Sequence, residues 1–161
     1  MGRLRQALVG RKVYLDANIF IYTLEVVKSW ADELNDVFFG LRSKEFSAVT
    51  SSLSLSECLV LPFKANRQDL VQVYLQTFLP RPYLEVASID NATLIVSANI
   101  RAQSGIKLPD AIHAATALTH QCTAMLTNDA GFKRLSGIDL FLLSEWIIAG
   151  EKDTVDCKLS R

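Results

Sequence analysis

Short apolar runs alternate with segments of helical periodicity along this chain, and this alternation restricts the possible folds more than any other feature. Runs typical of buried strands occupy residues 13–15, 48–50, 84–87, 124–127 and 138–141. Two parallel strands cannot be joined by a tight turn and need a crossover connection, usually a helix. Because helical segments separate most of these runs, we expect an α/β layer fold with a largely parallel sheet.

The expected helices carry recognisable start and stop signals. Pro80 follows one helical segment, Gly105 follows the next, and Pro109 opens a third. Helices are expected after Asn18 and after Ser29, which can cap them, around Glu57, and at residues 69–78, 93–103 and 110–120.

The composition indicates one domain. The chain has 161 residues, of which 50% are hydrophobic, with only 7 Gly and 4 Pro. Such a chain can bury one sizeable core and leaves little for linkers. We expect the domain at residues 12–148, after a basic lead segment at 1–11 and before a polar tail at 149–161 that frays.

Charge and cysteine content exclude several classes of protein. The 17 basic residues balance the 17 acidic ones, so any nucleic acid must be held by local patches rather than by net charge. Three cysteines at wide spacings form neither a zinc pattern nor a disulfide framework, which favours a reducing cytoplasm.

No apolar stretch approaches the roughly 20 residues that cross a bilayer, so we expect neither membrane insertion nor export.

Four acidic residues occupy positions where a carboxylate is costly. Asp16 and Asp129 each follow a predicted strand. Glu57 shares a helical face with leucines, and Asp110 lies in the first turn of a helix rich in alanine. Ligands of open α/β sheets bind at the carboxyl ends of the strands, so we expect Asp16 and Asp129 there, with Asp110 joining them.

A cluster of these acids predicts a cation. Like charges in apolar surroundings raise one another's pKa and lower stability unless a divalent ion compensates them. The four acids offer oxygen ligands, without cysteine or a clear histidine partner. Oxygen ligands suit hard ions, so we expect Mg²⁺, with Mn²⁺ as a substitute, rather than zinc or copper.

Each acid also has an ordinary structural explanation. Asp16 and Asp129 fit turn or cap positions, and Asp110 complements a helix dipole in its first turn. Glu57 fits the rim of an amphipathic helix. Taken one at a time, none of the four identifies a site.

Four segments contain the candidate acids, and they follow one another in the order YLDANIFIY at 14–22, SSLSLSE at 51–57, LPDAIHAA at 108–115 and LTND at 126–129. Together they resemble PIN domains, and most closely the VapC-type toxin branch. The resemblance covers about residues 12–145, and four motifs in the right order are specific where one would be weak.

This resemblance implies a three-layer α/β/α sandwich with a parallel central sheet and an acidic pocket for RNA hydrolysis. The family's metal-binding residues map onto Asp16, Glu57, Asp110 and Asp129, with Thr127 or Asn128 as a polar neighbour. It also implies a homodimer and, in the toxin branch, inhibition by a small antitoxin protein.

Chemistry assigns roles within this set. One or two Mg²⁺ ions would activate water in line with a phosphodiester and stabilise the leaving oxygen. We expect Asp16 and Asp110 as direct ligands, and Glu57 and Asp129 either as further ligands or as acceptors for metal-bound water. His113 shares a helical face with Asp110, where it either packs, supports a ligand or carries a proton.

Phosphate and base contacts have less specific candidates. Tyr22 and Trp30 either stack on bases or pack in the core or an interface. The lead segment is a possible RNA contact. The cations considered for phosphate neutralisation are Arg3, Arg5, Arg11, Lys12, Lys64, Arg67, Lys107, Lys133 and Arg134.

Three other functions compete with a toxin nuclease. A phosphatase or phosphoacceptor domain would also place an acid at Asp16, but the phosphatase wants a second acid where Asn18 stands, and neither type explains Glu57 or Asp110. A PIN-like adaptor that binds RNA or protein without metal is the alternative from another class, and a housekeeping RNA-processing nuclease is the alternative within the enzymes.

Overall fold

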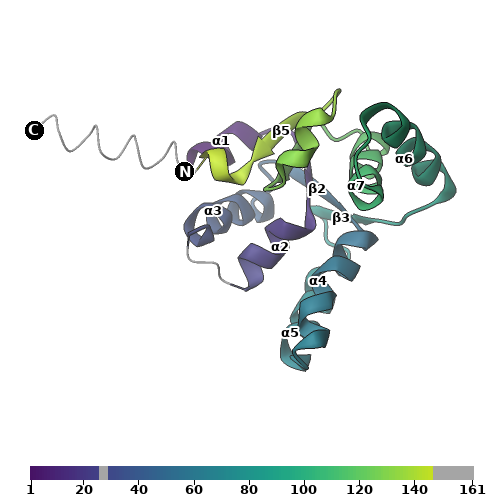
Figure 1. The fold of residues 1–161 in the computed structure, drawn as a ribbon. Helices are drawn as coiled ribbons and strands as arrows, with labels where there is room; N and C mark the ends of the chain where they lie inside the picture. Colours follow the sequence, from purple (N-terminus) through teal and green to yellow (C-terminus); the bar gives the residue numbers. More distant parts are fainter. Residues whose placement is uncertain (26–28, 147–161) are drawn as a thin grey trace, which may run out of the picture.

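The computed structural model describes residues 1–25 and 29–146 and contains one five-stranded sheet, all of whose neighbouring strands are parallel (Figure 1). The strand order across the sheet is β3-β2-β1-β4-β5. The strands are β1 (Lys12–Leu15), β2 (Ser47–Ser51), β3 (Leu84–Ala87), β4 (Ala124–Thr127) and β5 (Asp139–Leu142). The expectation of a largely parallel sheet is confirmed.

Helices cover both faces of this sheet, so the three-layer α/β/α architecture is also confirmed. In Figure 1, α1, α2 and α3 lie on one side, α6 and α7 on the other, and α4 and α5 run together away from the sheet. The helices are α1 (Arg3–Leu8), α2 (Ala17–Leu24), α3 (Ala31–Arg42), α4 (Ser52–Lys64), α5 (Gln68–Thr77), α6 (Asn91–Ser104) and α7 (Leu108–Thr119), with a short 3-10 helix, η1, at Ala130–Arg134.

The alternation of side chains along the strands divides the core in two. Val13 and Leu15 of β1 belong to the larger cluster, with the buried residues of α1, α2 and α3. Tyr14 points to the opposite face and packs with Met125 of β4 and Ala114 of α7. Strands with apolar residues on both faces are typical of a sheet covered by two helical layers.

Parallel pairing brings the carboxyl ends of β1, β2 and β4 to one edge. Leu15 pairs with Leu126, and the amide of Asp16 donates to the carbonyl of Leu126 at 3.1 Å. The end of β4 therefore lies beside the start of α2, and α4 begins at the same edge directly after β2.

Most helix signals were interpreted correctly, but two caps were wrong. Gly105 ends α6 with φ of +69°, and Pro109 lies in the first turn of α7, both as predicted. Asn18 does not cap α2, because Asp16 takes that position and Asn18 lies inside the helix. Ser29 does not cap α3, which begins at Ala31 after Trp30 and has no side-chain cap.

The basic lead segment contributes to the fold. Its residues Arg3–Leu8 form α1, whose Leu4 and Leu8 are fully buried in the larger core cluster. Arg5 bonds to Glu45 and Asp36. The polar tail lies outside the described residues, and no helix in the part of the chain that is described is long and apolar enough to span a membrane.

Candidate metal centre

Asp16 sits at the carboxyl end of β1 with its side chain almost completely enclosed, since only 6% of the residue is exposed. Its Oδ1 accepts a hydrogen bond from the amide of Ala17 at 2.7 Å. Its Oδ2 accepts from the hydroxyl of Thr127 at 2.5 Å and from Nδ2 of Asn18 at 2.8 Å. Burial raises the pKa of Asp16, and the charge of His113 and the bond from Thr127 only partly oppose it. Asp16 is a rigidly held carboxylate that a nearby cation would stabilise.

Glu57 on α4 and His113 on α7 both lie close to Asp16. Nε2 of His113 is 2.9 Å from Oε2 of Glu57 and 3.9 Å from Oδ1 of Asp16. Nδ1 of the same ring is 2.7 Å from the hydroxyl of Tyr14. One potential ligand atom from each of Asp16, Glu57 and His113 lies within 4.8 Å of the others. This is the tightest part of the site.

Asp110 lies in the first turn of α7, partly buried, and accepts no hydrogen bond from any described residue. Burial raises its pKa first, and the charges of Asp129 and Asp16 raise it further, whereas His113 and Lys107 lower it. The carboxylate is therefore close enough to the other acids to feel their charge, but it lies outside the cluster of three.

Asp129 is the most exposed of the four predicted acids. It caps η1, with its Oδ1 accepting from the amide of Gly131 at 2.7 Å. Its own amide donates to the hydroxyl of Thr127 at 3.0 Å, which ties it to the strand end beside Asp16. The cap role expected from local sequence is thus present, and no described residue donates a hydrogen bond to the second carboxylate oxygen.

The two residues expected as polar neighbours behave differently. Thr127 is buried and faces Asp16. Asn128 turns its side-chain oxygen to the amide of Ser144 at 3.0 Å, and only its backbone amide reaches toward the site, donating to Oδ1 of Asn18 at 3.3 Å.

Sequence reasoning missed Asn18 and Tyr14 as neighbours of the acids. The sequence predicts Asn18 as a helix cap, and its position two residues after Asp16 is the signal that could have placed it beside that acid. Tyr14 has no local signal, because its alternation along β1 only says that it faces away from Leu15.

The donor set fits a hard cation. Carboxylate oxygens from separate elements converge, and the raised pKa values of Asp16 and Asp110 show that the protein alone does not compensate their charge. A bound ion such as Mg²⁺ or Mn²⁺ commonly compensates the negative charge of such a cluster of carboxylates. Because Nε2 of His113 already faces Glu57, the imidazole is better placed to orient that carboxylate than to bind an ion.

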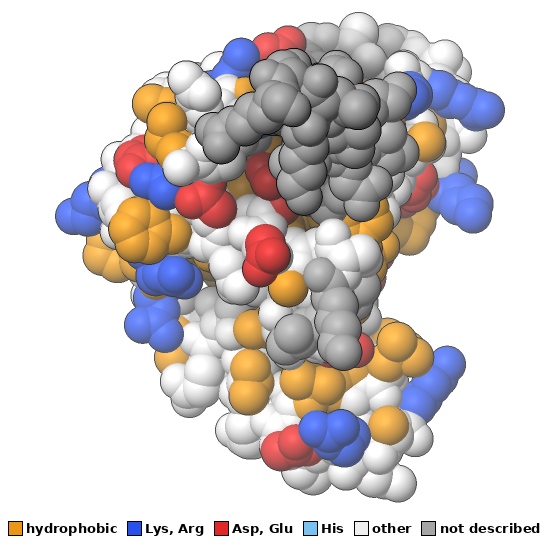
Figure 2. Space-filling view, turned by 90° about the vertical axis from the view of Figure 1, so that its left-hand side faces the viewer, with side chains coloured by type: hydrophobic (Ala, Val, Ile, Leu, Met, Phe, Trp, Pro, Cys, Tyr) orange, Lys and Arg blue, Asp and Glu red, His pale blue; other side chains and the backbone are white. Residues whose placement is uncertain are grey.

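The predicted basic residues do not gather into one patch. Several are paired: Arg5 with Glu45 and Asp36, Arg11 with Asp139, Lys12 with Glu85, Arg67 with Asp69 and Lys133 with Glu145. Arg3 also takes part in an interaction. Figure 2 shows Lys and Arg side chains scattered toward the edges of one face, with acidic side chains among them.

The remaining candidates are distributed over the surface. Lys64, Lys107 and Arg134 are exposed and form no ion pair with a described residue. Tyr22 and Trp30 stack on each other, with ring centroids 6.0 Å apart and planes inclined by 16°, and both pack against the core. His120 pairs with Glu85 at 2.9 Å, away from the acidic cluster.

Known proteins resemble this chain in fold. The family model for the PIN domain matches residues 13–138. The structure is similar to VapBC2 from Rickettsia felis bound to a promoter DNA fragment, with a TM-score of 0.62 and 22% identity over 81% of this chain and 98% of that one. It is also similar to Mycobacterium tuberculosis VapC20, a sarcin-ricin loop cleaving toxin, with a TM-score of 0.65 and 12% identity over 79% and 97% of the two chains. Among curated proteins, none matches the sequence.

Proposed function

Because this chain belongs to the PIN-domain family, we propose that it is a metal-dependent endoribonuclease and the toxin of a type II toxin–antitoxin pair, acting in the cytoplasm. The observation that carries the proposal is the cluster of Asp16, Glu57 and His113, whose potential ligand atoms lie within 4.8 Å of one another. The cluster occupies the edge of the sheet where α/β folds bind their ligands. The likeness to VapC structures supports the toxin assignment.

The four acids have different proposed roles at this edge of the sheet. Mg²⁺ or Mn²⁺, when bound, would offset the clustered negative charge and activate water for attack on a phosphodiester. Asp16 and Asp110 would hold the ion, Asp16 because its bond from Thr127 fixes its direction, and Asp110 because no described residue occupies its oxygens. Glu57 and Asp129 each keep one oxygen without a hydrogen bond from a described residue, which suits them to complete the shell or to accept a proton from water.

RNA is the proposed substrate. The support from the surface is local: Lys107 is exposed, precedes α7 directly, and its charge lowers the pKa of Asp110, so it lies near the site. A phosphate held by Lys107 would place an RNA backbone beside the acids. No net charge is needed for such a contact.

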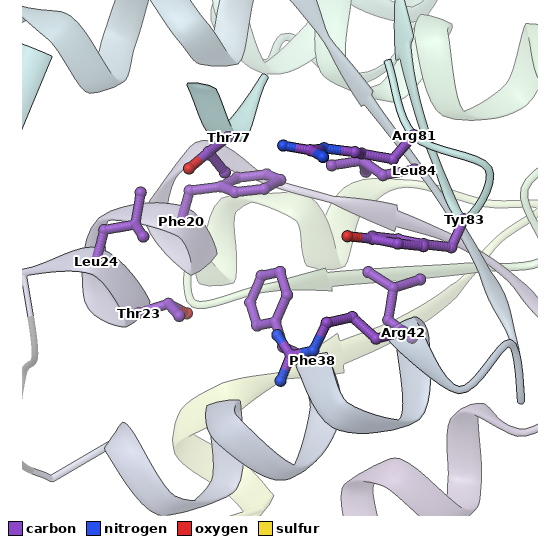
Figure 3. Close-up of a pocket in the computed structure, with 10 residues that line it drawn as sticks. Phe20, Thr23, Leu24, Phe38, Arg42, Thr77, Arg81, Tyr83 and Leu84 are labelled. Carbon is purple, nitrogen blue, oxygen red and sulfur yellow. The ribbon is translucent and has the colours of Figure 1, made fainter. Parts of the chain in front are cut away.

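An antitoxin partner is the second part of the proposal, and a cavity supports it. The cavity has a volume of about 220 Å³ and lies between α2, α3, α5 and the start of β3. Figure 3 shows Phe20, Phe38 and Leu84 around it, with the Arg81 side chain and the Tyr83 hydroxyl directed inward.

The chemistry of the lining defines the partner segment. The aromatic and aliphatic walls suit a bulky apolar side chain, and Arg42 and Arg81 in the lining suit an acidic neighbour of that side chain. We propose that a segment of a small antitoxin protein docks here. Arg42→Glu together with Arg81→Glu should weaken the complex with a small protein encoded beside the gene, while cleavage by the free toxin is unchanged.

A homodimer is the third part. The paired helices α4 and α5 expose Leu61, Phe63 and Val73, each more than two fifths accessible. Apolar side chains grouped in this way are typical of association surfaces. Sedimentation of the purified protein would determine the oligomeric state, and a monomer at all concentrations would contradict this part alone.

The nuclease is tested by cleavage of a mixed cellular RNA pool with Mg²⁺, with Mn²⁺ and with EDTA. The control is the double variant Asp16→Asn, Asp110→Asn, prepared free of any partner. We expect discrete fragments that require metal and are absent with the variant. RNA binding that persists in EDTA, without cleavage under any metal condition, would instead indicate an adaptor.

A further inference from the structure

Tyr14 is a buried polar residue that the carboxylate chemistry does not itself use. Its side chain is fully enclosed on the α7 side of the sheet, among Val49, Met125 and Ala114. Its hydroxyl lies 2.7 Å from Nδ1 of His113. A buried hydroxyl needs a partner. This one has the ring that contacts Glu57 and the nearby side chains of Ser51 and Ser54, whose hydrogen bonds partly oppose the rise that burial causes in the pKa of Tyr14.

In the cluster of Asp16, Glu57 and His113, Glu57 has the greatest conformational freedom. Its side chain is long, and 36% of it is exposed. The bond to His113 at 2.9 Å is the only hydrogen bond that its carboxylate makes with a described residue. His113 is itself only 2% exposed. The direction of the Glu57 carboxylate thus depends on how the imidazole is held.

We propose that Tyr14 is a positioning residue that acts through His113: its hydroxyl fixes the imidazole ring, and the ring in turn aims the Glu57 carboxylate at the metal site. This inference rests on the proposed function, since it assigns Glu57 to an ion. At many metal sites, hydrogen bonds from neighbouring residues to the ligand side chains orient those ligands toward the metal.

The positions of the hydrogens on Tyr14 and His113 agree with this assignment. Burial raises the pKa of Tyr14, so its hydroxyl keeps its proton. When the ring of His113 is neutral, this hydroxyl donates to Nδ1. The ring hydrogen then stands on Nε2, where it donates to Glu57. Without the Tyr14 hydroxyl, Nδ1 would lose this partner, and the bond from Nε2 to Glu57 would hold the ring with less support.

The first test is to titrate the metal-free protein with Mn²⁺ and to measure the binding affinity by calorimetry. Tyr14→Phe removes only the hydroxyl and should weaken Mn²⁺ binding by about 10–100-fold. The matched control is Tyr74→Phe, because Tyr74 is also fully buried and donates to Glu25 at 2.8 Å. Its affinity for Mn²⁺ should equal that of the wild type.

A double-mutant cycle separates positioning from a general packing effect. In a His113→Gln background the amide can still donate to Glu57, but it cannot use Tyr14 as the imidazole does. Tyr14→Phe should therefore cause no further loss of Mn²⁺ affinity in this background. An equal loss in both backgrounds would show that Tyr14 acts by packing and would overturn the inference.

Nitrogen NMR of His113 in the metal-free wild type provides a test that needs no variant. At alkaline pH, where the ring is neutral, we expect the hydrogen on Nε2, and a hydrogen on Nδ1 would overturn the inference. Wild-type protein that neither binds Mn²⁺ nor cleaves RNA would refute the proposed function. Wild-type protein that does both, beside an unaffected Tyr14→Phe, would refute only the role of Tyr14.

Discussion

The hydroxyl of Thr127 donates a 2.5 Å hydrogen bond to Oδ2 of Asp16, joining the ends of β4 and β1 across 111 positions of sequence. The hydroxyl oxygen of Thr127 also accepts a hydrogen bond from the amide of Asp129 at 3.0 Å and one from Nδ2 of Asn18 at 3.2 Å. One buried hydroxyl thus connects two of the predicted acids and sets the orientation of the less exposed one.

Replacement of Thr127 by Val keeps the shape of the side chain and removes this hydroxyl. Asp16 would lose a hydrogen bond to its charged form, so we expect about 1.5–3 kcal/mol less stability and about 10–100-fold weaker Mn²⁺ binding. Denaturant unfolding and Mn²⁺ titration measure the two effects. Thr127→Ser keeps the hydroxyl and should retain most of both; equal losses in the two variants would assign the effect to the methyl group instead.

Divalent metal should stabilise the folded protein. An ion that binds only the native state raises its stability by about 2.7 kcal/mol at 100 times Kd. We expect the thermal midpoint to rise with added Mn²⁺ and to return with EDTA. The double variant Asp16→Asn, Asp110→Asn should show no such rise, and a rise of equal size in the variant would place the ion elsewhere.

The stability of the metal-free protein should depend on pH through Asp16. Burial raises its pKa above 3.8, so the native protein takes up a proton at a higher pH than the unfolded chain does. The free energy of unfolding therefore gains from this group as the pH falls toward 3.8, and loses as it rises through the folded pKa. Burial lowers the pKa of His113, but Glu57 and Asp16 raise it overall, so its contribution is also lost with rising pH.

Groups such as Asp36 and Asp90, whose pKa values are lowered, act in the opposite direction and lose their stabilisation as the pH falls. The contribution of Asp16 is isolated by comparison with Asp16→Asn, which stays neutral. The midpoint of the variant minus that of the wild type should be largest near pH 7 and should shrink toward about pH 4. A difference in midpoint that grows as the pH falls would contradict the assignment to Asp16.

The lead segment should matter for folding. Leu4 is fully buried, and Leu4→Ala should cost about 2–5 kcal/mol of the free energy of unfolding. Val9→Ala is the control, because Val9 at the end of α1 is 48% exposed. Chemical denaturation measures both, and an unchanged midpoint for Leu4→Ala would show that α1 does not support the core in solution.

Lys107 should contribute to RNA binding rather than to folding. Lys107→Gln should weaken binding of single-stranded RNA of any sequence and reduce the slope of log affinity against log salt by about 0.7. Lys44→Gln is the control, since Lys44 is exposed in the turn that precedes β2, at the opposite edge of the sheet. Filter binding over a salt series in EDTA would measure the slopes, and equal slopes for Lys107→Gln and the wild type would exclude this contact.

Local patterns in the sequence determined the elements and their order. Apolar runs of strand length, Gly105 and Pro109 act over a few residues, and the strands and helix ends that they predicted are present. The sequence also placed Asp16 and Asp129 directly after strands, which the parallel sheet then brings to one edge.

Tertiary structure alone decided which polar groups meet. The bonds from Thr127 to Asp16 and from Tyr14 to His113 each join residues about one hundred positions apart. Such contacts depend on strand register and on the packing of α7 against the sheet, and periodicity within a segment specifies neither. For the same reason, the charge of Arg5 suggested an RNA contact, whereas the packing of α1 buries most of that side chain against Glu45 and Asp36.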